Sequence, residues 1–225
     1  VLRAGLLRSS GVDPVVSGAA VFVETLTLMA VGAALSAVLL AIGYREHTTL
    51  LAIACGLALL AGIPTIPPVF RRVAGMLKVF RRGIRASQAL ARLNMPLIAA
   101  GWALLIPGWL LLGASLAACL IAIPGVQVKL AQLPLITAAV SLAMVAGFLS
   151  MIPGGLGVRE LVVMSLLAPI YGELPAVVSA IVLRLAWLFA EGLFSLALLP
   201  FKPPKAPLDD EIVAAAQGAA WRESR

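Results

Sequence analysis

The chain has 225 residues, of which 62% are hydrophobic and only 12% charged, and its formal net charge is +7. A mean hydropathy of +1.07 excludes an ordinary soluble domain and indicates a polytopic membrane protein. The positive charge gathers beside apolar runs, so we assign it to lipid headgroups and membrane topology and expect no nucleic-acid partner.

Apolar segments long enough to cross a bilayer recur along the chain. A hydrocarbon core of about 30 Å needs roughly 20 apolar residues per helix. The sequence therefore predicts an all-α membrane domain over residues 1–200, with spans at about 14–43, 49–66, 95–123, 133–151 and 175–199 and a short helix at 160–168. The polar tail, residues 201–225, is too short to form a second domain.

A basic segment, residues 71–94, lies between the second and third spans. Apolar side chains are interleaved among its charges, which predicts an amphipathic helix on the headgroup surface. The residues expected to contact anionic lipid are Arg71, Arg72, Lys78, Arg81, Arg82 and Arg85. Because basic loops stay on the cytoplasmic side, we expect this segment and the C-terminal tail to be cytoplasmic.

This orientation requires residues 133–171 to begin and end outside, and so to form a hairpin. The hairpin is either re-entrant or has one unusually short crossing. At its deep end lies Ile152–Glu160, with the sequence IPGGLGVRE. Backbone that leaves the helix within a bilayer is tolerated only where protein or water satisfies it, and charges there are costly. We therefore interpret this break as the candidate site.

The break contains residue types that suit an anion. Gly154, Gly155 and Gly157 permit close backbone approach and left-handed dihedral angles. The first amides of the short helix, near Val158–Leu161, are expected to be unpaired and to receive a phosphate or carboxylate. Arg159 would add a bidentate grip on a phosphate. The alternative is a tight turn in which the charged residues only cap or pair with neighbours.

Three further charges lie within predicted spans. Arg184 and Glu191 share one face of the last helix, two turns apart, which is too far for a close pair. Glu160 is the expected partner of Arg184, and Glu24 is expected to approach Arg159 from the other end of the chain. Structural ion pairs that lock helices together and contacts with lipid remain equal alternatives for this set.

The first 24 residues resemble the segment from Val158 to Arg184. Both run from a Val/Arg start through a short apolar stretch, a Gly and a Pro into a helix with a charged residue. The predicted topology gives the two long helices opposite directions, as in an inverted-repeat transporter. On this hypothesis the chain is truncated at its N-terminus and begins just after a first copy of the Gly-rich break.

The run Pro153–Glu160, then Gly172, then a helix with Arg184 and Gly192, resembles the membrane region of the lysylphosphatidylglycerol synthase family. That family includes the bacterial multiple peptide resistance factor. The resemblance covers most of the chain, from Val1 to about residue 199. It implies a lipid-handling module in a bacterial inner membrane, which in the best-known members is a flippase for aminoacylated phosphatidylglycerol.

The sequence departs from the family pattern at two points. Glu24 is followed by Thr25, where members often have an arginine. The soluble aminoacyl-transferring domain of the full synthases has no counterpart in the sequence, so we expect no aminoacyl-lipid synthesis from this chain alone and predict that it is not an enzyme.

The sequence thus predicts flippase-like translocation or binding of a phospholipid or lipid-linked intermediate. The predicted headgroup-binding residues are Gly154, Gly155, Gly157, Arg159, Glu160 and Arg184, with Glu24 and Glu191 balancing charge or binding a cationic headgroup. A membrane-embedded enzyme subunit and a non-catalytic scaffold are the alternatives. Membrane phospholipids are the expected partners, with a partner enzyme and a second copy left open. The single histidine, His47, is isolated, so no metal or cofactor is expected.

Overall fold

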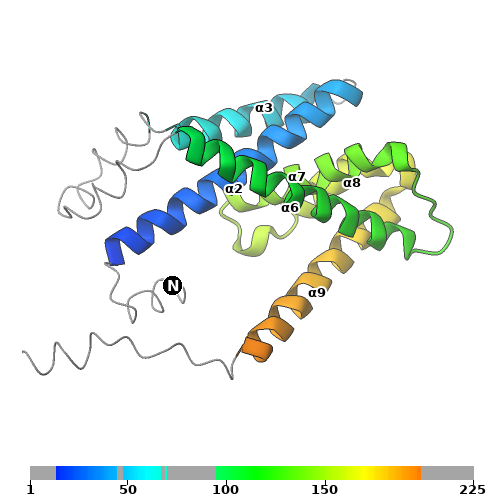
Figure 1. Cartoon of the computed structure of the whole chain (residues 1–225). Helices are drawn as coiled ribbons and strands as arrows, with labels where there is room; N and C mark the ends of the chain where they lie inside the picture. Colours follow the sequence, from blue (N-terminus) through cyan, green and yellow to red (C-terminus); the bar gives the residue numbers. More distant parts are fainter. Residues whose placement is uncertain (1–13, 45–47, 67–68, 70–94, 199–225) are drawn as a thin grey trace, which may run out of the picture.

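The computed structural model describes residues 14–44, 48–66, 69 and 95–198 (Figure 1). Every regular element within these ranges is helical. The predictions made for the basic segment, for the first copy of the repeat up to residue 13 and for the tail lie outside the described residues. The anionic-lipid surface and the inverted repeat therefore stay predictions.

The elements follow the predicted order. The α-helices are α2 (Pro14–Gly43), α3 (Thr48–Gly62), α6 (Met95–Ile121), α7 (Leu133–Leu149), α8 (Val158–Tyr171) and α9 (Glu173–Leu198), and the 3₁₀ turns are η1 (Ile63–Thr65), η3 (Leu130–Gln132) and η4 (Pro153–Gly155). Five helical stretches in the described residues are long and apolar enough to cross a membrane. The chain is thus an all-α polytopic membrane protein, as predicted.

Two elements differ from the prediction. The second span was predicted to run to residue 66, but α3 is a shorter helix of 15 residues. Pro64 has no amide to donate, so the chain continues as the η1 turn. The helix after the break is longer than predicted: α8 begins at Val158, directly after the positive φ of Gly157, and ends at Tyr171, directly before Gly172, whose φ is again positive.

The longer α8 changes the interpretation of the hairpin. Together with η4 it forms a stretch of 19 residues, Pro153–Tyr171, that is long enough to cross a membrane. The helix predicted at 160–168 was therefore too short. The hairpin itself is present, because α7 and α8 pack against each other on either side of the break.

The centre of the bundle is α7, which contacts α2, α6 and α8. Its buried residues are mostly small, including Ala138, Ala139 and Ala143. Small side chains let neighbouring membrane helices approach closely. The approach of α6 is especially close, since a Cβ added at Gly113 would lie 2.8 Å from the Cβ of Thr137.

In contrast, α9 lies at the periphery. It packs against α8 and α6, while its C-terminal part extends away from the other helices (Figure 1). The Gly-rich break therefore lies beside a buried helix, α7, and close to the middle of an exposed helix, α9. The candidate site therefore lies between the buried helix α7 and the exposed helix α9.

Candidate functional site

The break between α7 and α8 depends on backbone conformations that favour glycine. Gly154, Gly155 and Gly157 have φ values of 67°, 66° and 81°, and Met151 also has a positive φ, of 57°. A left-handed conformation is unfavourable for residues with a side chain, and most so for large ones. At the end of α7 the Ser150 hydroxyl donates to the carbonyl of Gly147 over 2.8 Å. Three glycines within four residues thus let the chain turn sharply from one helix into the next.

The start of α8 is already partly capped. The Gly157 amide donates to Oε2 of Glu160 at 2.8 Å, which is half of a capping box, and the Leu161 amide donates to the Gly157 carbonyl at 2.9 Å. The expectation of unpaired amides throughout this turn was therefore wrong at Leu161. A carboxylate of the chain itself occupies the position beside the positive end of the helix dipole.

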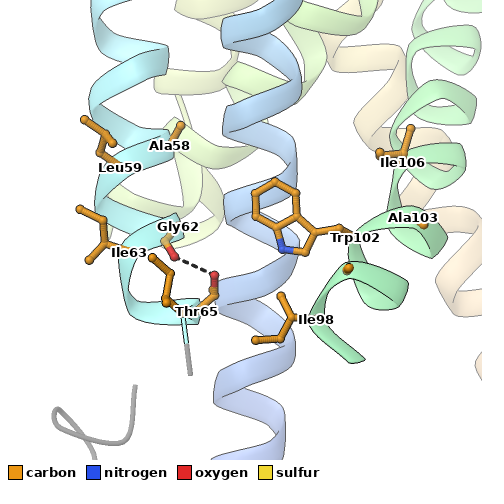
Figure 2. Close-up of a pocket in the computed structure, with 11 residues that line it drawn as sticks. Ala58, Leu59, Gly62, Ile63, Thr65, Ile98, Trp102, Ala103 and Ile106 are labelled. Atoms are coloured by element: carbon orange, nitrogen blue, oxygen red, sulfur yellow. Dashed lines mark hydrogen bonds between the residues drawn. The ribbon is translucent and has the colours of Figure 1, made fainter. Parts of the chain in front are cut away.

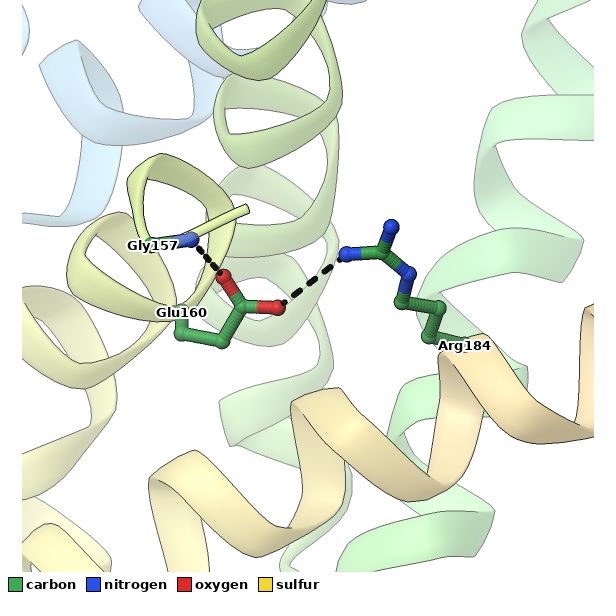
Figure 3. Close-up of polar contacts among 3 residues, drawn as sticks. All are labelled: Gly157, Glu160 and Arg184. Atoms are coloured by element: carbon green, nitrogen blue, oxygen red, sulfur yellow. Dashed lines mark hydrogen bonds and ion pairs between the residues drawn. The ribbon is translucent and has the colours of Figure 1, made fainter. Parts of the chain in front are cut away.

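The same carboxylate faces an arginine on α9. Glu160 Oε1 lies 3.6 Å from Nη1 of Arg184 (Figure 3), so the predicted pairing of these two residues is confirmed. The two side chains are only 28% and 18% exposed, for Arg184 and Glu160 respectively. The separation exceeds the usual 2.7–2.9 Å of a charge-assisted hydrogen bond. The contact is an ion pair, and Nη1 of Arg184 still lacks a hydrogen-bond acceptor.

The Arg159 side chain lies over two glycines. A Cβ added at Gly147 on α7 would lie 2.6 Å from both Cγ and Nε of Arg159, and one added at Gly155 would lie 2.8 Å from Nε. The Arg184 guanidinium is equally close to Gly154, where an added Cβ would contact Nη2. Gly147, Gly154 and Gly155 therefore make room for two guanidinium groups.

Two of the buried guanidinium nitrogens have no hydrogen-bond partner. Arg159 Nε and Arg184 Nη1 are inaccessible to solvent and make no hydrogen bond. An unsatisfied buried donor costs about 1–3 kcal/mol, and more when the group is charged. Such donors are uncommon, and each calls for an acceptor such as water or an anion.

A small cavity of about 40 Å³ joins these groups. Arg159, Glu160 and Arg184 line it together with apolar residues that include Leu116 on α6 and Trp187 on α9. We call it the charged pocket. Since a water needs at least about 10–15 Å³, the pocket admits a few waters or the oxygens of one small anionic group.

The remaining predicted residues lie elsewhere. Glu24 on α2 and Glu191 on α9 are exposed, and neither lines the charged pocket. Their charge-balancing role stays a prediction. Gly147 was not predicted, although the sequence carries a signal for it: small residues in a membrane helix mark places of close approach.

Comparison with known proteins gives no match: no family model, no curated protein and no solved structure matches this chain. The fold and the pocket define a class, an α-helical membrane protein with a cationic pocket beside a helix break. The resemblance to the lysylphosphatidylglycerol synthase family stays a prediction.

Proposed function

We propose that this chain is a lipid-handling membrane protein that binds the phosphate of a phospholipid, or of a lipid-linked intermediate, and moves it between leaflets in a flippase-like manner. One observation carries the proposal. Two arginines, Arg159 and Arg184, each bury a nitrogen without a hydrogen-bond partner and line one pocket within helices that can cross a membrane. An ionisable residue at such a place is functional by default.

The charge of the pocket supports an anionic ligand. Arg159 and Arg184 contribute two positive charges, and Glu160 is the only carboxylate among the residues that line the pocket. A buried charge without a counter-ion is costly, so the excess of one positive charge favours a monoanion. A phosphodiester carries one negative charge and offers oxygens to which guanidinium groups bind well.

Glu160 gives a way to release the ligand. Its carboxylate contacts both the Gly157 amide and Arg184, so a phosphate that binds Arg184 competes with it. If Arg184 exchanges between the Glu160 carboxylate and the phosphate, the phosphate can bind and leave while the arginine keeps an anionic partner throughout. If the headgroup also carries a cation, such as a lysyl group, the freed carboxylate can bind it.

The proposal includes the side of the membrane. We infer that the protein resides in a bacterial inner membrane with its basic segment and C-terminal tail in the cytoplasm. The basis for the bacterial inner membrane is the resemblance to the lysylphosphatidylglycerol synthase family, and the basis for the orientation is the distribution of lysine and arginine along the sequence.

The test is a leaflet-accessibility assay with purified protein in vesicles that contain a fluorescent phospholipid. The wild-type chain should expose inner-leaflet label faster than protein-free vesicles do. Arg159→Gln and Arg184→Gln should abolish this excess rate. Lys129→Gln is the matched control, because it removes the same charge from an exposed residue outside the pocket.

Fold must be verified in each variant, since breaking an ion pair from one side also destabilises. Undiminished transport by a correctly folded Arg159→Gln and Arg184→Gln protein would refute the assigned roles. Equal loss in Lys129→Gln would show that the assay reports total charge and not the pocket.

A further inference from the structure

A second and much larger cavity lies between α3 with η1 and the first half of α6 (Figure 2). Its volume is about 610 Å³, within the range of about 300–1,000 Å³ that is usual for small-molecule sites. It is separate from the charged pocket. Trp102 lines this larger cavity and Leu116 lines the charged pocket. At 1.5 Å per residue the two positions are about 21 Å apart along α6. We call it the apolar cavity.

The apolar cavity opens on the outside of the bundle. Leu59 and Ile63 from one wall and Ile106 from the other are exposed. None of the residues that line it is charged. In a protein whose helices cross a membrane, an exposed apolar surface at this position meets the acyl chains of the bilayer. A lipid headgroup or a peptide would find almost no polar partners here.

One hydrogen-bond donor among the side chains that line the apolar cavity lacks an acceptor. The Thr65 hydroxyl already donates to the Gly62 carbonyl at 2.7 Å. The indole of Trp102 extends from α6 toward the opposite wall, and its Nε1 is buried without a hydrogen-bond partner (Figure 2). A buried indole N–H usually has an acceptor.

The depth of Trp102 indicates which acceptor is available. It lies one helical turn inside the apolar stretch that begins at Ile98. Tryptophan is enriched at this boundary between headgroups and hydrocarbon. The ester carbonyls of a diacyl lipid lie at the same boundary, where a chain and its ester group enter together.

We propose that the apolar cavity binds one acyl chain of a diacyl phospholipid, whose ester carbonyl accepts a hydrogen bond from Trp102 Nε1. The proposal is independent of transport through the charged pocket. It assigns a fixed lipid to the α3–α6 side of the protein.

The experiment uses the fluorescence of Trp102 in the full chain with Trp109, Trp187 and Trp221 changed to Phe. The protein is reconstituted with increasing fractions of phosphatidylcholine brominated on its acyl chains, which quench a nearby indole. The reference variant carries Trp102→Phe and Leu104→Trp in the same background, because Leu104 is 81% exposed and does not line the cavity. Half-quenching of Trp102 should need a fraction of brominated lipid about fivefold lower than half-quenching of the reference variant does. This ratio corresponds to about 1 kcal/mol, the net free energy of one hydrogen bond.

Two glycine-to-leucine substitutions test where the acyl chain binds. Gly62 lines the cavity and has open space around its Cβ position, so Gly62→Leu should fill the cavity without a clash and remove the fivefold preference. Gly56 on the same helix also has open space but does not line the cavity, so Gly56→Leu should preserve the preference. An unbrominated diester lipid should also relieve quenching about fivefold better than its diether analogue, which lacks the carbonyl.

The proposal is overturned if Trp102 and the Leu104→Trp reference variant are quenched alike, as they would be if the chain's own residues between Ile66 and Met95 filled the cavity. Equal competition by diester and diether lipid would overturn the carbonyl contact. If the triple Phe background does not fold, phospholipids that copurify with the otherwise unchanged chain are counted by mass spectrometry. Gly56→Leu should then retain one more lipid than Gly62→Leu, and equal numbers would contradict the proposal.

Discussion

The apolar stretches that contain α7 and α9 have the same mean hydropathy, but the two helices have opposite places in the bundle. Of the apolar stretch that contains α7, 61% is buried, against 11% for α9. The buried face of α7 consists largely of small residues, whereas α9 exposes large ones such as Leu188 and Phe189. Hydropathy therefore decides whether a helix enters a membrane, while residue size decides which helices it packs against.

The charged pocket lies on the border between these two helices. Arg159 is held over Gly147 of α7, whereas Arg184 projects from α9. The Arg159 guanidinium is thus held against the core, whereas the Arg184 guanidinium belongs to a helix of which only a small part is buried. This difference suits a site whose ligand must be both held and released.

The largest effect is expected where α7 meets Arg159. Gly147→Leu should strongly lower the recovery of folded protein, because even a Cβ at this position would overlap the arginine side chain and force it to move. Gly192→Leu on α9 is the matched control, since Gly192 has open space around it. Recovery of monodisperse protein in mild detergent measures both. Normal recovery of Gly147→Leu would show that Arg159 does not lie over α7.

Leucine truncation tests the packing of the same two helices. Leu142 on α7 is fully buried, so Leu142→Ala should destabilise the protein by about 2–5 kcal/mol. Leu188 on α9 is 58% exposed, and Leu188→Ala should change stability by at most about 0.5 kcal/mol. Unfolding in increasing concentrations of a denaturing detergent measures the change in the free energy of unfolding for both variants. Equal losses would contradict the assignment of α7 as core and α9 as periphery.

The contact between α8 and α9 should matter less than the core. Glu160→Ala removes the partner of Arg184 and the cap of Gly157 together. Because both side chains of the pair keep some exposure, we expect a loss below the about 3–5 kcal/mol of a fully buried pair. Glu160→Gln keeps an acceptor for the Gly157 amide and should lose less than Glu160→Ala. Identical unfolding curves for the two variants would mean that the cap contributes nothing.

The smallest effect is expected at the far end of α8. The Tyr171 hydroxyl donates to Oε1 of Gln132 at 2.8 Å, which ties the helix to the turn before α7. Tyr171→Phe should cost about 1 kcal/mol, the net value of one hydrogen bond. Tyr44→Phe should cost less, because the Tyr44 hydroxyl lies 3.3 Å from its acceptor, the carbonyl of Ala131. The reverse order would show that the Tyr171 contact does not hold α8.

The sequence predicted the parts of this structure that depend on local chemistry. Long apolar runs identified the helices, and the glycines of the break identified the turn at Gly154–Gly157. The pairing of Arg184 with Glu160 was predictable because each charge within an apolar segment needs a partner. The end of α8 was predicted too early, at residue 168, and the helix continues through Pro169 to Tyr171.

What sequence could not reveal depends on tertiary packing. Gly147 resembles any other small residue of α7 until the Arg159 side chain is seen to lie over it. Capping and pairing by the charged residues of the break were one alternative, and only the structure shows that Glu160 does both, with the Gly157 amide and with Arg184. The apolar cavity is formed by α3 and α6, whose facing surfaces no pattern in the sequence distinguishes from their lipid-facing ones.

The central claim is that Arg159 and Arg184 bind a lipid phosphate through buried donors that lack a hydrogen-bond acceptor. The most direct measurement is thermal unfolding of the detergent-solubilised full chain with increasing glycerophosphoglycerol, a phosphodiester headgroup without acyl chains. Binding at 100 times Kd stabilises a protein by about 2.7 kcal/mol. The wild-type chain and Lys129→Gln should therefore show a rising Tm, and Arg159→Gln should show none. An equal rise in a folded Arg159→Gln protein would contradict the account.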